Sequence, residues 1–417
     1  MSRFIVSGGN KLSGSATVQG AKNSILPVLS AALLCEGENV LFNCPRLSDV
    51  SAAARILRYL GCEVKREGSA VLVNSESVNG AEIPDSLMRE MRGSIIFLGS
   101  LLGRRKKAVL TFPGGCELGP RPIDLHLKAL KSLGVKIRES RGAIECTAPD
   151  GLKGAKIALS FPSVGATENI ILAAVTAQGT TTLTNAAREP EIADLCEMLN
   201  KAGARIYGAG EGVVVIDGVK SLKAVEHTVI PDRIVAATIM SAAAVTGSEL
   251  MLEGVIQSHL NAVTSVFEDS GCDIKFDCGN LLIKAPERLK PLPVVRTMPY
   301  PGFPTDAHAV MMSAACAADG ASVFVENIFE DRFKHVSELT RMGADIKVEN
   351  RVAVVNGVKK LYGAEVRARD LRGAAALVTA ALAAEGETTI DGICYLDRGY
   401  EDFELVLGSL GADIKRI

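Results

Sequence analysis

Residues 156–218 read KIALSFPSVGATENIILAAVTAQGTTTLTNAAREPEIADLCEMLNKAGARIYGAGEGVVVIDG. The strand-like runs KIALS and TTTLTN are each followed by a helical pattern, apolar over 163–178 and amphipathic over 189–202. Two short apolar runs, ARIYGA and VVVIDG, then predict a β-hairpin. The expected order is strand, helix, strand, helix, strand, strand. Strands that alternate with helices favour an α/β fold in which helices cover sheets.

This segment is one copy of a sixfold repeat. A short phrase with a central glycine recurs at intervals of roughly 70 residues and joins a helical pattern to a strand pattern each time. Glycine suits that junction because it adopts the left-handed conformation that ends a helix. A chain of 417 residues is too long for one core, so we predict two domains of three units each, with a boundary near residue 230. The phrases are LGCEV at Leu60, LGVKI at Leu133, AGARI at Ala202, SGCDI at Ser270, MGADI at Met342 and LGADI at Leu410.

The composition argues against several function classes. A net charge of −2 and the lack of tryptophan do not suit nucleic-acid binding, which uses basic faces and aromatic platforms. The apolar stretch 234–245 is shorter than the ~20 residues of a membrane span, and the first residues lack the layout of a signal peptide. The ten cysteines form no CxxC pair. We expect a cytoplasmic protein with reduced thiols, no metal, no cofactor and no nucleic-acid, membrane or obligatory protein partner.

Charged and polar residues recur where helices are expected to begin. A cation there opposes the helix dipole, but it helps the helix start to hold an anion. The alternative is that some of these arginines form salt bridges with neighbouring carboxylates. Taken together, they predict a small, strongly anionic substrate, held where the helix starts of two domains face each other. The first helices open at Lys22-Asn23, Arg92-Gly93-Ser94, Ser163-Val164-Gly165, Asp232-Arg233, Thr305-Asp306 and Asp370-Leu371-Arg372, and the second helices at Arg46 and Asp49, Arg121, Arg188 and Glu189, Ser258 and His259, Arg332, and Arg398.

Residues 111–124, TFPGGCELGPRPID, cannot form regular structure because glycine and proline surround Cys116. We expect this thiol to be exposed, and a nearby cation such as Arg121 lowers the pKa of a thiol. A buried structural cysteine is the alternative, and it is the preferred interpretation for the other cysteines, which stand in apolar runs. The loop lacks the Gly-Lys-Ser/Thr ending of a nucleotide-triphosphate loop, so it is a weak indication of ATP binding.

Ten segments along the whole chain resemble the enolpyruvyl transferase family, in its branch that uses UDP-N-acetylglucosamine. The most specific are the AKN turn, the PGGC…RP loop and DRGYE. The resemblance implies a two-domain inside-out α/β barrel, with helices inside and sheets outside, built from six repeated strand-helix-strand-helix-strand-strand units. It implies domains at 22–230 and at 1–21 joined to 231–417, with the first strand crossing over. The segments are QGAKNSILP, MRGSI, PGGCELGPRPIDLH, SVGATENI, NAAREPEI, PDRI, FPTDAH, ENIFEDRFKHVSEL, RDLRGAAA and DRGYE.

The resemblance also implies an activity. Members of this branch transfer the enolpyruvyl group of phosphoenolpyruvate to the 3′-hydroxyl of UDP-N-acetylglucosamine and release phosphate, in the first committed step of peptidoglycan synthesis. The expected partners are therefore phosphoenolpyruvate and UDP-N-acetylglucosamine, without a cofactor. Membership also implies a role in cell shape and division, and inhibition by fosfomycin.

The resemblance further implies a role for each matching residue. Lys22, Arg121 and Arg398 resemble the clamp on phosphoenolpyruvate. Asp306 resembles the base near the 3′-hydroxyl, with helix N-capping as the alternative, and Cys116 matches the loop cysteine that adds to phosphoenolpyruvate and is alkylated by fosfomycin. The remaining positions are Arg92 and Arg372 near the clamp, Asn23 at the sugar, Pro122, Asp124, Leu125, Ser163, Val164 and Gly165 at the uridine and diphosphate with Arg121, and Ile328, Arg332 and Asp370 elsewhere on the substrate side.

Two departures and three rival interpretations remain. Some members carry lysine at Phe161 and tryptophan at Ile96, which puts a nucleotide contact and the packing near Arg92 in doubt. The sister transferase that uses shikimate 3-phosphate normally has a serine-lysine-serine phrase where this chain has AKNS. An RNA 3′-phosphate cyclase needs a histidine nucleophile, and no histidine here has a matching context. A non-catalytic homologue would have lost some of the residues named above.

Overall fold

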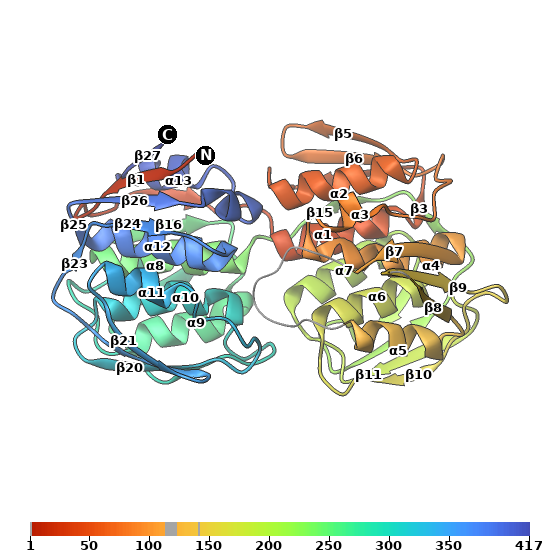
Figure 1. Cartoon of the computed structure of the whole chain (residues 1–417). Coiled ribbons are helices and arrows are strands. Elements are labelled where there is room, and N and C mark those ends of the chain that lie inside the picture. Colours follow the sequence, from red (N-terminus) through yellow and green to blue (C-terminus); the bar gives the residue numbers. More distant parts are fainter. Residues whose placement is uncertain (1, 113–122, 141) are drawn as a thin grey trace. The chain divides into compact units, whose positions relative to one another are not determined.

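The structure is a computed structural model that describes residues 2–112, 123–140 and 142–417 (Figure 1). The described chain divides into two compact units. The N-terminal unit contains residues 20–112, 123–140 and 142–230, and the C-terminal unit contains residues 2–19 and 231–417. Each unit has its own buried hydrophobic cluster. The predicted α/β class is confirmed, because strands and helices alternate throughout both units.

Three sheets of the N-terminal unit share one strand order. A central strand pairs in parallel with a short strand on one side and antiparallel with a hairpin on the other. In the sheet whose central strand is β7 (Lys107–Thr111), a parallel bridge from Glu82 to Val109 takes the place of the short strand. The sheets are β15 (Glu226–Thr228), β4 (Glu38–Phe42), β6 (Ala70–Asn74), β5 (Glu63–Glu67); β7 (Lys107–Thr111), β9 (Ala143–Thr147), β8 (Lys136–Ser140); and β10 (Lys156–Ala158), β11 (Thr180–Thr184), β13 (Val213–Asp217), β12 (Arg205–Tyr207), and a small sheet joins β14 (Leu222–Lys223) to β3 (Cys35–Glu36).

The C-terminal unit repeats this order in three further sheets. The central strand is again parallel to one neighbour and antiparallel to the other. The sheets are β2 (Ser15–Thr17), β16 (Glu249–Glu253), β18 (Asn280–Lys284), β17 (Asp273–Asp277); β19 (Val295–Arg296), β20 (Ala321–Val325), β22 (Val352–Asn356), β21 (Asp345–Glu349); and β24 (Glu365–Arg367), β26 (Glu387–Asp391), β1 (Phe4–Ser7), β27 (Asp413–Arg416), with a small sheet of β23 (Leu361–Tyr362) and β25 (Ala384–Glu385).

Strands from the start of the chain complete the C-terminal unit (Figure 1). β1 pairs antiparallel with both β26 and β27, so that Phe4 lies opposite Ile390 on one side and Arg416 on the other. β1 thus fills the place that the second hairpin strand occupies in the other sheets. β2 pairs in parallel with β16, and β15, which ends at Thr228, pairs in parallel with β4 of the N-terminal unit.

Two kinds of helix follow from two sequence patterns. Helices rich in apolar and small residues on every side are almost wholly buried, as expected when no face is polar. In the C-terminal unit, three such helices pack against one another, and buried hydroxyls such as Thr379 bond the carbonyl one turn earlier. They are α1 (Lys22–Ala32), α4 (Phe97–Arg105), α6 (Val164–Ala174), α8 (Arg233–Thr246), α10 (Thr305–Cys316) and α12 (Leu371–Ala383).

The other helices bury one face, show their polar residues to solvent, or span only one or two turns. They are α2 (Ser48–Tyr59), α3 (Asp85–Met88), α5 (Asp124–Ser132), α7 (Pro190–Lys201), α9 (Gln257–Asp269), α11 (Val336–Arg341) and α13 (Phe403–Ser409), with 3-10 turns η1 (Arg92–Ile96) and η2 (Ile393–Arg398).

The glycines at the centre of the six repeated phrases end helices, as predicted. All six have a positive φ, between 89° and 103°, directly after a helix and ahead of a strand. A side chain is strained in that conformation, so glycine is the residue that allows a helix to turn at once into a strand. The six glycines are Gly61, Gly134, Gly203, Gly271, Gly343 and Gly411.

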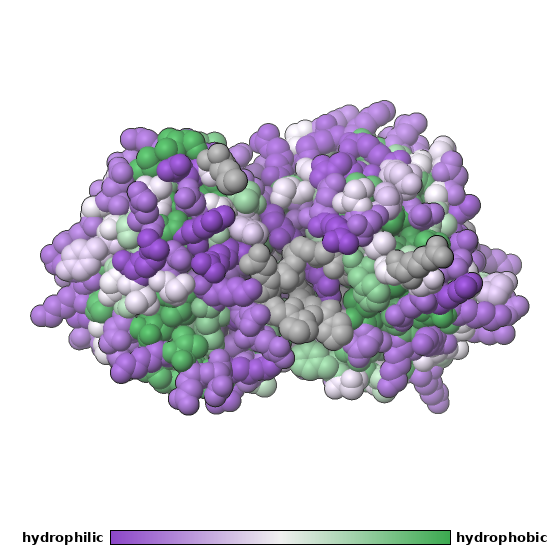
Figure 2. All heavy atoms as spheres, in the orientation of Figure 1, coloured by the Kyte–Doolittle hydropathy of each residue, from purple (hydrophilic) through white to green (hydrophobic). Residues whose placement is uncertain are grey.

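The face of the molecule seen in Figure 2 is mainly hydrophilic. Figure 2 shows charged and polar side chains over most of the visible face of both units, with apolar residues in small areas between them. None of the helices within the described ranges combines the length and apolar character that a bilayer crossing requires.

We predict that Gly218→Ala destabilises the N-terminal unit by about 2–3 kcal/mol, in the range of core overpacking. A Cβ at Gly218 would lie 1.6 Å from the Ala177 carbonyl oxygen, which belongs to the backbone and cannot rotate away. Gly212→Ala is the control, because a Cβ there meets nothing within 4 Å. Thermal unfolding followed by circular dichroism should show a lower Tm for Gly218→Ala alone; equal Tm values would contradict the prediction.

Candidate active site

Asp306 lies at the centre of a charged cluster in the C-terminal unit. It is the second residue of α10, and its two carboxylate oxygens accept hydrogen bonds from Arg332 Nη2 at 2.7 Å and from Arg372 Nη2 at 2.9 Å. The two guanidinium side chains are 2% and 3% exposed, whereas the carboxylate is 26% exposed. The cluster is therefore open to solvent at Asp306, and the arginines support it from the interior.

This arrangement bears on the alternative interpretation of Asp306 as a helix N-cap. The N-cap position of α10 is Pro304, and it makes no side-chain capping bond. Asp306 instead lies within the first turn, where its charge suits the positive end of the helix dipole. Its carboxylate bridges two arginines, so N-capping is not its role.

Arg372 is held from several sides. Its Nη1 donates to the Tyr400 hydroxyl at 3.2 Å, and the guanidinium lies over the Tyr400 ring. Burial opposes its charge, but the neighbouring Asp306, Tyr400 and Asp232 raise the pKa of Arg372 above its ordinary value. The buried Nε has no hydrogen-bond partner among the described residues. Arg372 is therefore a permanent cation with a donor left over.

Asp370 begins α12 by capping it. Its side chain accepts from the backbone N–H groups of Arg372 at 3.1 Å and Gly373 at 2.9 Å. A cap of this kind satisfies two of the unpaired donors at a helix start and fixes the first turn. Asp370 thereby sets the position from which the Arg372 side chain reaches Asp306.

Arg332 is anchored to the start of α10. Its Nε and Nη2 donate to the Thr305 carbonyl oxygen at 3.2 and 2.8 Å, next to the bond with Asp306. Arg332 precedes α11 by four residues and Arg398 ends η2, ahead of α13. The prediction that these two arginines stand at the openings of the second helices is therefore wrong by about one turn, because a turn or a 3-10 segment comes before each helix.

The N-terminal unit carries a second set of predicted residues. Lys22 is the first residue of α1, and its Nζ lies 3.0 Å from Asp49 at the start of α2. Both side chains are largely buried. Asn23 follows in α1, and Arg92 begins η1. The salt-bridge alternative thus applies to Lys22, Arg332 and Arg372, and also to Arg188, which lies 3.9 Å from Glu211. The first three pairs lie at a helix start where an anion would be favoured.

The predicted uridine and diphosphate segments lie at two other helix starts. Ser163 is the N-cap of α6 and accepts from the Ala166 N–H at 3.4 Å, with Val164 and Gly165 in the first turn. Asp124 and Leu125 begin α5. A Cβ at Gly165 would lie 3.1 Å from the His126 ring of α5, so the small residue allows α5 and α6 to approach closely here.

Three predicted residues, Cys116, Arg121 and Pro122, lie outside the described residues. The nine described cysteines are free. Burial raises the pKa of all seven buried ones, for example Cys196 and Cys316, to about 12. These thiols are small core residues, as the sequence predicts. Cys278 and Cys394 are exposed.

The two departures from the family pattern have different surroundings. Phe161 is 44% exposed ahead of α6, so a lysine there would reach solvent without disturbing the core. Ile96 is buried at the end of η1. Its smaller side chain is accommodated by the packing of η1 against α4 and α6.

Several residues of these sites were missed by sequence reasoning. Glu326 and Tyr400 lie in the motifs ENIF and DRGYE, but no charge pattern marked them. Glu168, in the motif SVGATENI, is buried in α6, and burial, with the carboxylates of Glu191 and Glu189, raises its pKa well above the usual range. A polar residue inside an otherwise apolar helix was the signal that could have found Glu168.

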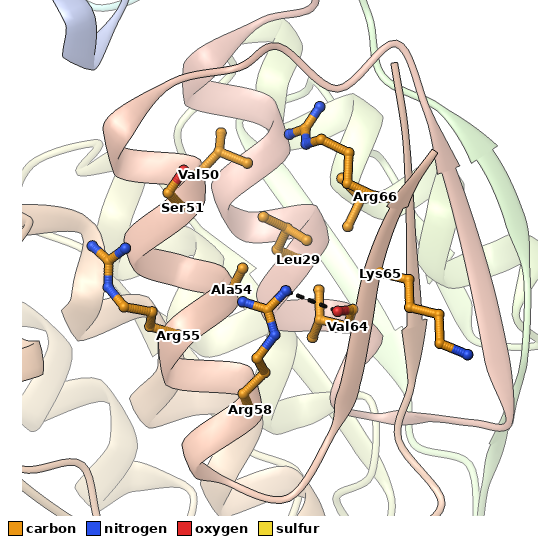
Figure 3. Close-up of a pocket in the computed structure, with 10 residues that line it drawn as sticks. Leu29, Val50, Ser51, Ala54, Arg55, Arg58, Val64, Lys65 and Arg66 are labelled. Atoms are coloured by element: carbon orange, nitrogen blue, oxygen red, sulfur yellow. Dashed lines mark hydrogen bonds between the residues drawn. The ribbon is translucent and has the colours of Figure 1, made fainter. Parts of the chain in front are cut away.

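A separate pocket of about 140 Å³ lies between α2 and the β5–β6 hairpin (Figure 3). Arg58 donates to the Val64 carbonyl at 2.8 Å, and Arg66 donates to Cys44 and Pro45 carbonyls at 2.8 and 3.2 Å. These arginines brace the hairpin against its neighbours. None of the predicted site residues lines this pocket, and the described residues contain no cluster suited to hold a metal ion.

The fold agrees with the comparisons to known proteins. The model of the EPSP synthase (3-phosphoshikimate 1-carboxyvinyltransferase) family matches residues 6–407. The chain belongs to this family. The solved enolpyruvyl transferase NikO from Streptomyces tendae is similar, with a TM-score of 0.89 and 27% identity over 100% of this chain and 98% of that one. EPSP synthase from Acinetobacter baumannii, at 22% identity and a TM-score of 0.75 over the full length of both chains, shares the fold.

Within the family, two relatives of about 50% identity share one name. UDP-N-acetylglucosamine 1-carboxyvinyltransferase 2 of Caldanaerobacter subterraneus subsp. tengcongensis is 51% identical over all 417 residues of both chains. UDP-N-acetylglucosamine 1-carboxyvinyltransferase 1 of Symbiobacterium thermophilum is 50% identical over 100% of this chain and 95% of its own. The predicted membership in the enolpyruvyl transferase family is confirmed.

The buried histidines predict how stability depends on pH. Burial lowers the pKa of His308 to about 3 and that of His335 to about 4, so both are neutral in the folded protein at pH 6. Unfolded histidine titrates near 6.5. Between these values the unfolded chain binds more protons, so stability falls as the pH falls from about 6.5 towards 4.

We expect Tm to drop between pH 7 and pH 4.5, and to drop less in His308→Gln, which does not titrate. We choose His308 for this substitution because its ring is buried against Phe324 and Phe333. An equal drop in the parent and the variant would contradict the assignment of this effect to His308.

Proposed function

We propose that this protein transfers the enolpyruvyl group of phosphoenolpyruvate to the 3′-hydroxyl of UDP-N-acetylglucosamine with release of phosphate, the first committed step of peptidoglycan synthesis. The observation that carries the proposal is the 51% identity, over the full length of both chains, with a relative named for this reaction. The NikO likeness adds the enolpyruvyl transferase class. Helix starts with basic side chains suit a substrate pair that carries phosphate and carboxylate groups.

The chemistry is an addition followed by an elimination. Carbon 3 of phosphoenolpyruvate takes a proton, and the sugar oxygen attacks carbon 2 while it loses its own proton. The resulting tetrahedral ketal then loses phosphate and a proton from carbon 3, which restores the double bond. Atoms and electrons balance without an oxidant or a reductant. The cationic character at carbon 2 develops beside two anionic groups, so fixed cations are needed to hold those groups and the departing phosphate.

Asp306 is the proposed base for the 3′-hydroxyl. Each carboxylate oxygen accepts from one arginine, Oδ1 from Arg332 and Oδ2 from Arg372. The side chain is 26% exposed, which lets a substrate hydroxyl reach it. The two arginines fix the carboxylate in one orientation, which is the condition for efficient proton transfer.

The cations have proposed roles in both units. Lys22, Arg121 and Arg398 bind phosphoenolpyruvate, with Arg92 and Arg372 as further positive charges. The remaining proposed contacts address the nucleotide sugar. These are Asn23, Pro122, Asp124, Leu125, Ser163, Val164, Gly165, Ile328, Arg332 and Asp370, and Cys116 is the proposed nucleophile that adds to phosphoenolpyruvate.

We also propose the finer architecture and the compartment. Sheets that repeat one strand order around buried helices support an inside-out α/β barrel built from six units, with domains at 22–230 and at 1–21 joined to 231–417. Free thiols at all described cysteines are consistent with a reducing compartment, which for this pathway is the cytoplasm. A role in cell shape and division and sensitivity to fosfomycin follow from the proposed reaction.

We predict phosphate release from phosphoenolpyruvate that depends on UDP-N-acetylglucosamine and is lost in Asp306→Ala, with phosphoenolpyruvate binding still measurable by calorimetry. Removing the proposed base should lower kcat by at least about 10²-fold. Asp319→Ala is the control, because Asp319 also pairs with an arginine but is mostly exposed.

Two results would refute these assignments. Turnover within tenfold of the parent in folded Asp306→Ala would rule out the base. A parent enzyme that accepts shikimate 3-phosphate and not UDP-N-acetylglucosamine would replace the proposed substrate with that of the sister transferase.

For the loop cysteine we predict that Cys116→Asp folds and escapes time-dependent inactivation by fosfomycin. The drug alkylates a thiol, and aspartate offers none. Cys278→Ser, at an exposed cysteine outside the proposed site, should keep the parent's inactivation rate. Continued inactivation of Cys116→Asp at the parent's rate would count against Cys116 as the target.

A further inference from the structure

Glu326 departs from the repeat at a defined position. It is the first residue after β20, the central strand of its sheet. After four of the other central strands the corresponding residue is asparagine or glycine with a positive φ: Asn43 at 56°, Asn185 at 55°, Gly254 at 72° and Gly392 at 79°. Glu326 does not share that backbone conformation, and its side chain is 1% exposed. A buried carboxylate has replaced a turn residue.

Four donors satisfy this carboxylate. Its Oε1 accepts from the Thr297 hydroxyl at 3.0 Å and from the N–H groups of Ile328 at 2.7 Å and Phe329 at 3.0 Å. Its Oε2 accepts from the Thr305 hydroxyl at 2.9 Å. Burying a carboxylate costs free energy unless its oxygens accept hydrogen bonds, and both oxygens of Glu326 do so.

The contacts join two segments of the proposed active site. Thr305 begins α10 and precedes Asp306, and its carbonyl oxygen accepts hydrogen bonds from the buried Arg332 guanidinium. The N–H groups of Ile328 and Phe329 belong to the turn that leads to Arg332. Glu326 is therefore tied both to the helix that carries Asp306 and to the turn that carries Ile328.

The nearby histidine does not compete for this carboxylate. His308 Nδ1 lies 3.8 Å from Glu326 Oε2, which is longer than a hydrogen bond. Burial lowers the pKa of His308 to about 3, so this ring brings no charge at neutral pH. The position of Glu326 is thus set by the two threonines and the two backbone N–H groups.

We propose that Glu326 is a positioning residue for the reaction: its buried carboxylate aligns the start of α10 with the turn at Ile328, and so holds Asp306 and the nucleotide-sugar contact in register. This inference rests on the proposed function. Glu326 does not touch the reacting atoms itself. It acts through Thr305 and through the backbone of Ile328 and Phe329.

The test compares Glu326→Ala with Glu326→Gln. The alanine variant loses all four bonds, whereas the glutamine oxygen can still accept from Thr297, Ile328 and Phe329, and its amide can donate to the Thr305 hydroxyl. We expect Glu326→Ala to lower kcat about tenfold or more and to raise the KM for UDP-N-acetylglucosamine, because a shift of about 1 Å in a catalytic group costs up to 10²-fold. The KM for phosphoenolpyruvate should stay within about twofold, and Glu326→Gln should recover most of the lost rate.

Thr305→Val provides a second variant in case Glu326→Ala does not fold. It removes one hydroxyl but keeps the backbone carbonyl that binds Arg332, and we expect a fall in kcat of the same direction. Glu253→Gln is the matched control: Glu253 ends the central strand β16 and accepts one threonine hydroxyl, from Thr17 at 3.2 Å, but at an exposed site. Glu253→Gln should leave kcat and both KM values unchanged.

The outcomes separate this inference from the proposed function. If the parent is active and folded Glu326→Ala or Thr305→Val keeps kcat and both KM values within about twofold, the positioning role is wrong and the function stands. Equal loss in Glu253→Gln would also overturn it, because the effect would then not be specific to Glu326. A parent without phosphate release dependent on UDP-N-acetylglucosamine overturns the proposed function, and this role with it.

Discussion

Asp306 shares one carboxylate between two arginines that are almost completely buried, and the geometry of the C-terminal site depends on that sharing. Two guanidinium groups cannot remain inside a protein without compensation. Arg332 and Arg372 come from different segments, so the carboxylate that pairs with both also fixes the distance between them. Asp370, Tyr400, Thr305 and Glu326 then hold the arginines and the helix start from behind. The carboxylate proposed as the base is therefore also the group that holds these two buried arginines together.

A duplicated architecture makes such a site possible. Each repeat ends a central strand and begins a helix in the same place, and both units use that place for polar residues. Four of the six central strands are followed by an asparagine or a glycine at positive φ. Ser163 and Asp232 cap the helices that follow the short strands β10 and β15. Two positions depart from these patterns: Lys22, which pairs with Asp49 at a helix start, and Glu326, whose carboxylate has four donors.

Much of this organisation could be predicted from the sequence. The order of elements over 156–218 and the helix-ending glycines are confirmed, because local propensity and backbone freedom decide them. The place of Arg332 and Arg398 relative to their helices was wrong, since short turns and 3-10 segments leave no periodic pattern. Glu326 was missed for another reason. Its partners Thr297 and Thr305 are distant in sequence, and only the folded sheet brings their hydroxyls to one carboxylate. The roles assigned to individual site residues stay predictions.

The pairing of β1 with β26 and β27 has a consequence for biosynthesis. Residues 4–7 leave the ribosome long before residues 387–416, so β1 must wait for these later residues before it finds its neighbours. The N-terminal unit, by contrast, has all its strands once Thr228 has emerged. Vectorial synthesis therefore favours completion of the N-terminal unit while the leading segment is still unpaired. The C-terminal unit closes only after β27 has been synthesised, when β1 can pair with both β26 and β27.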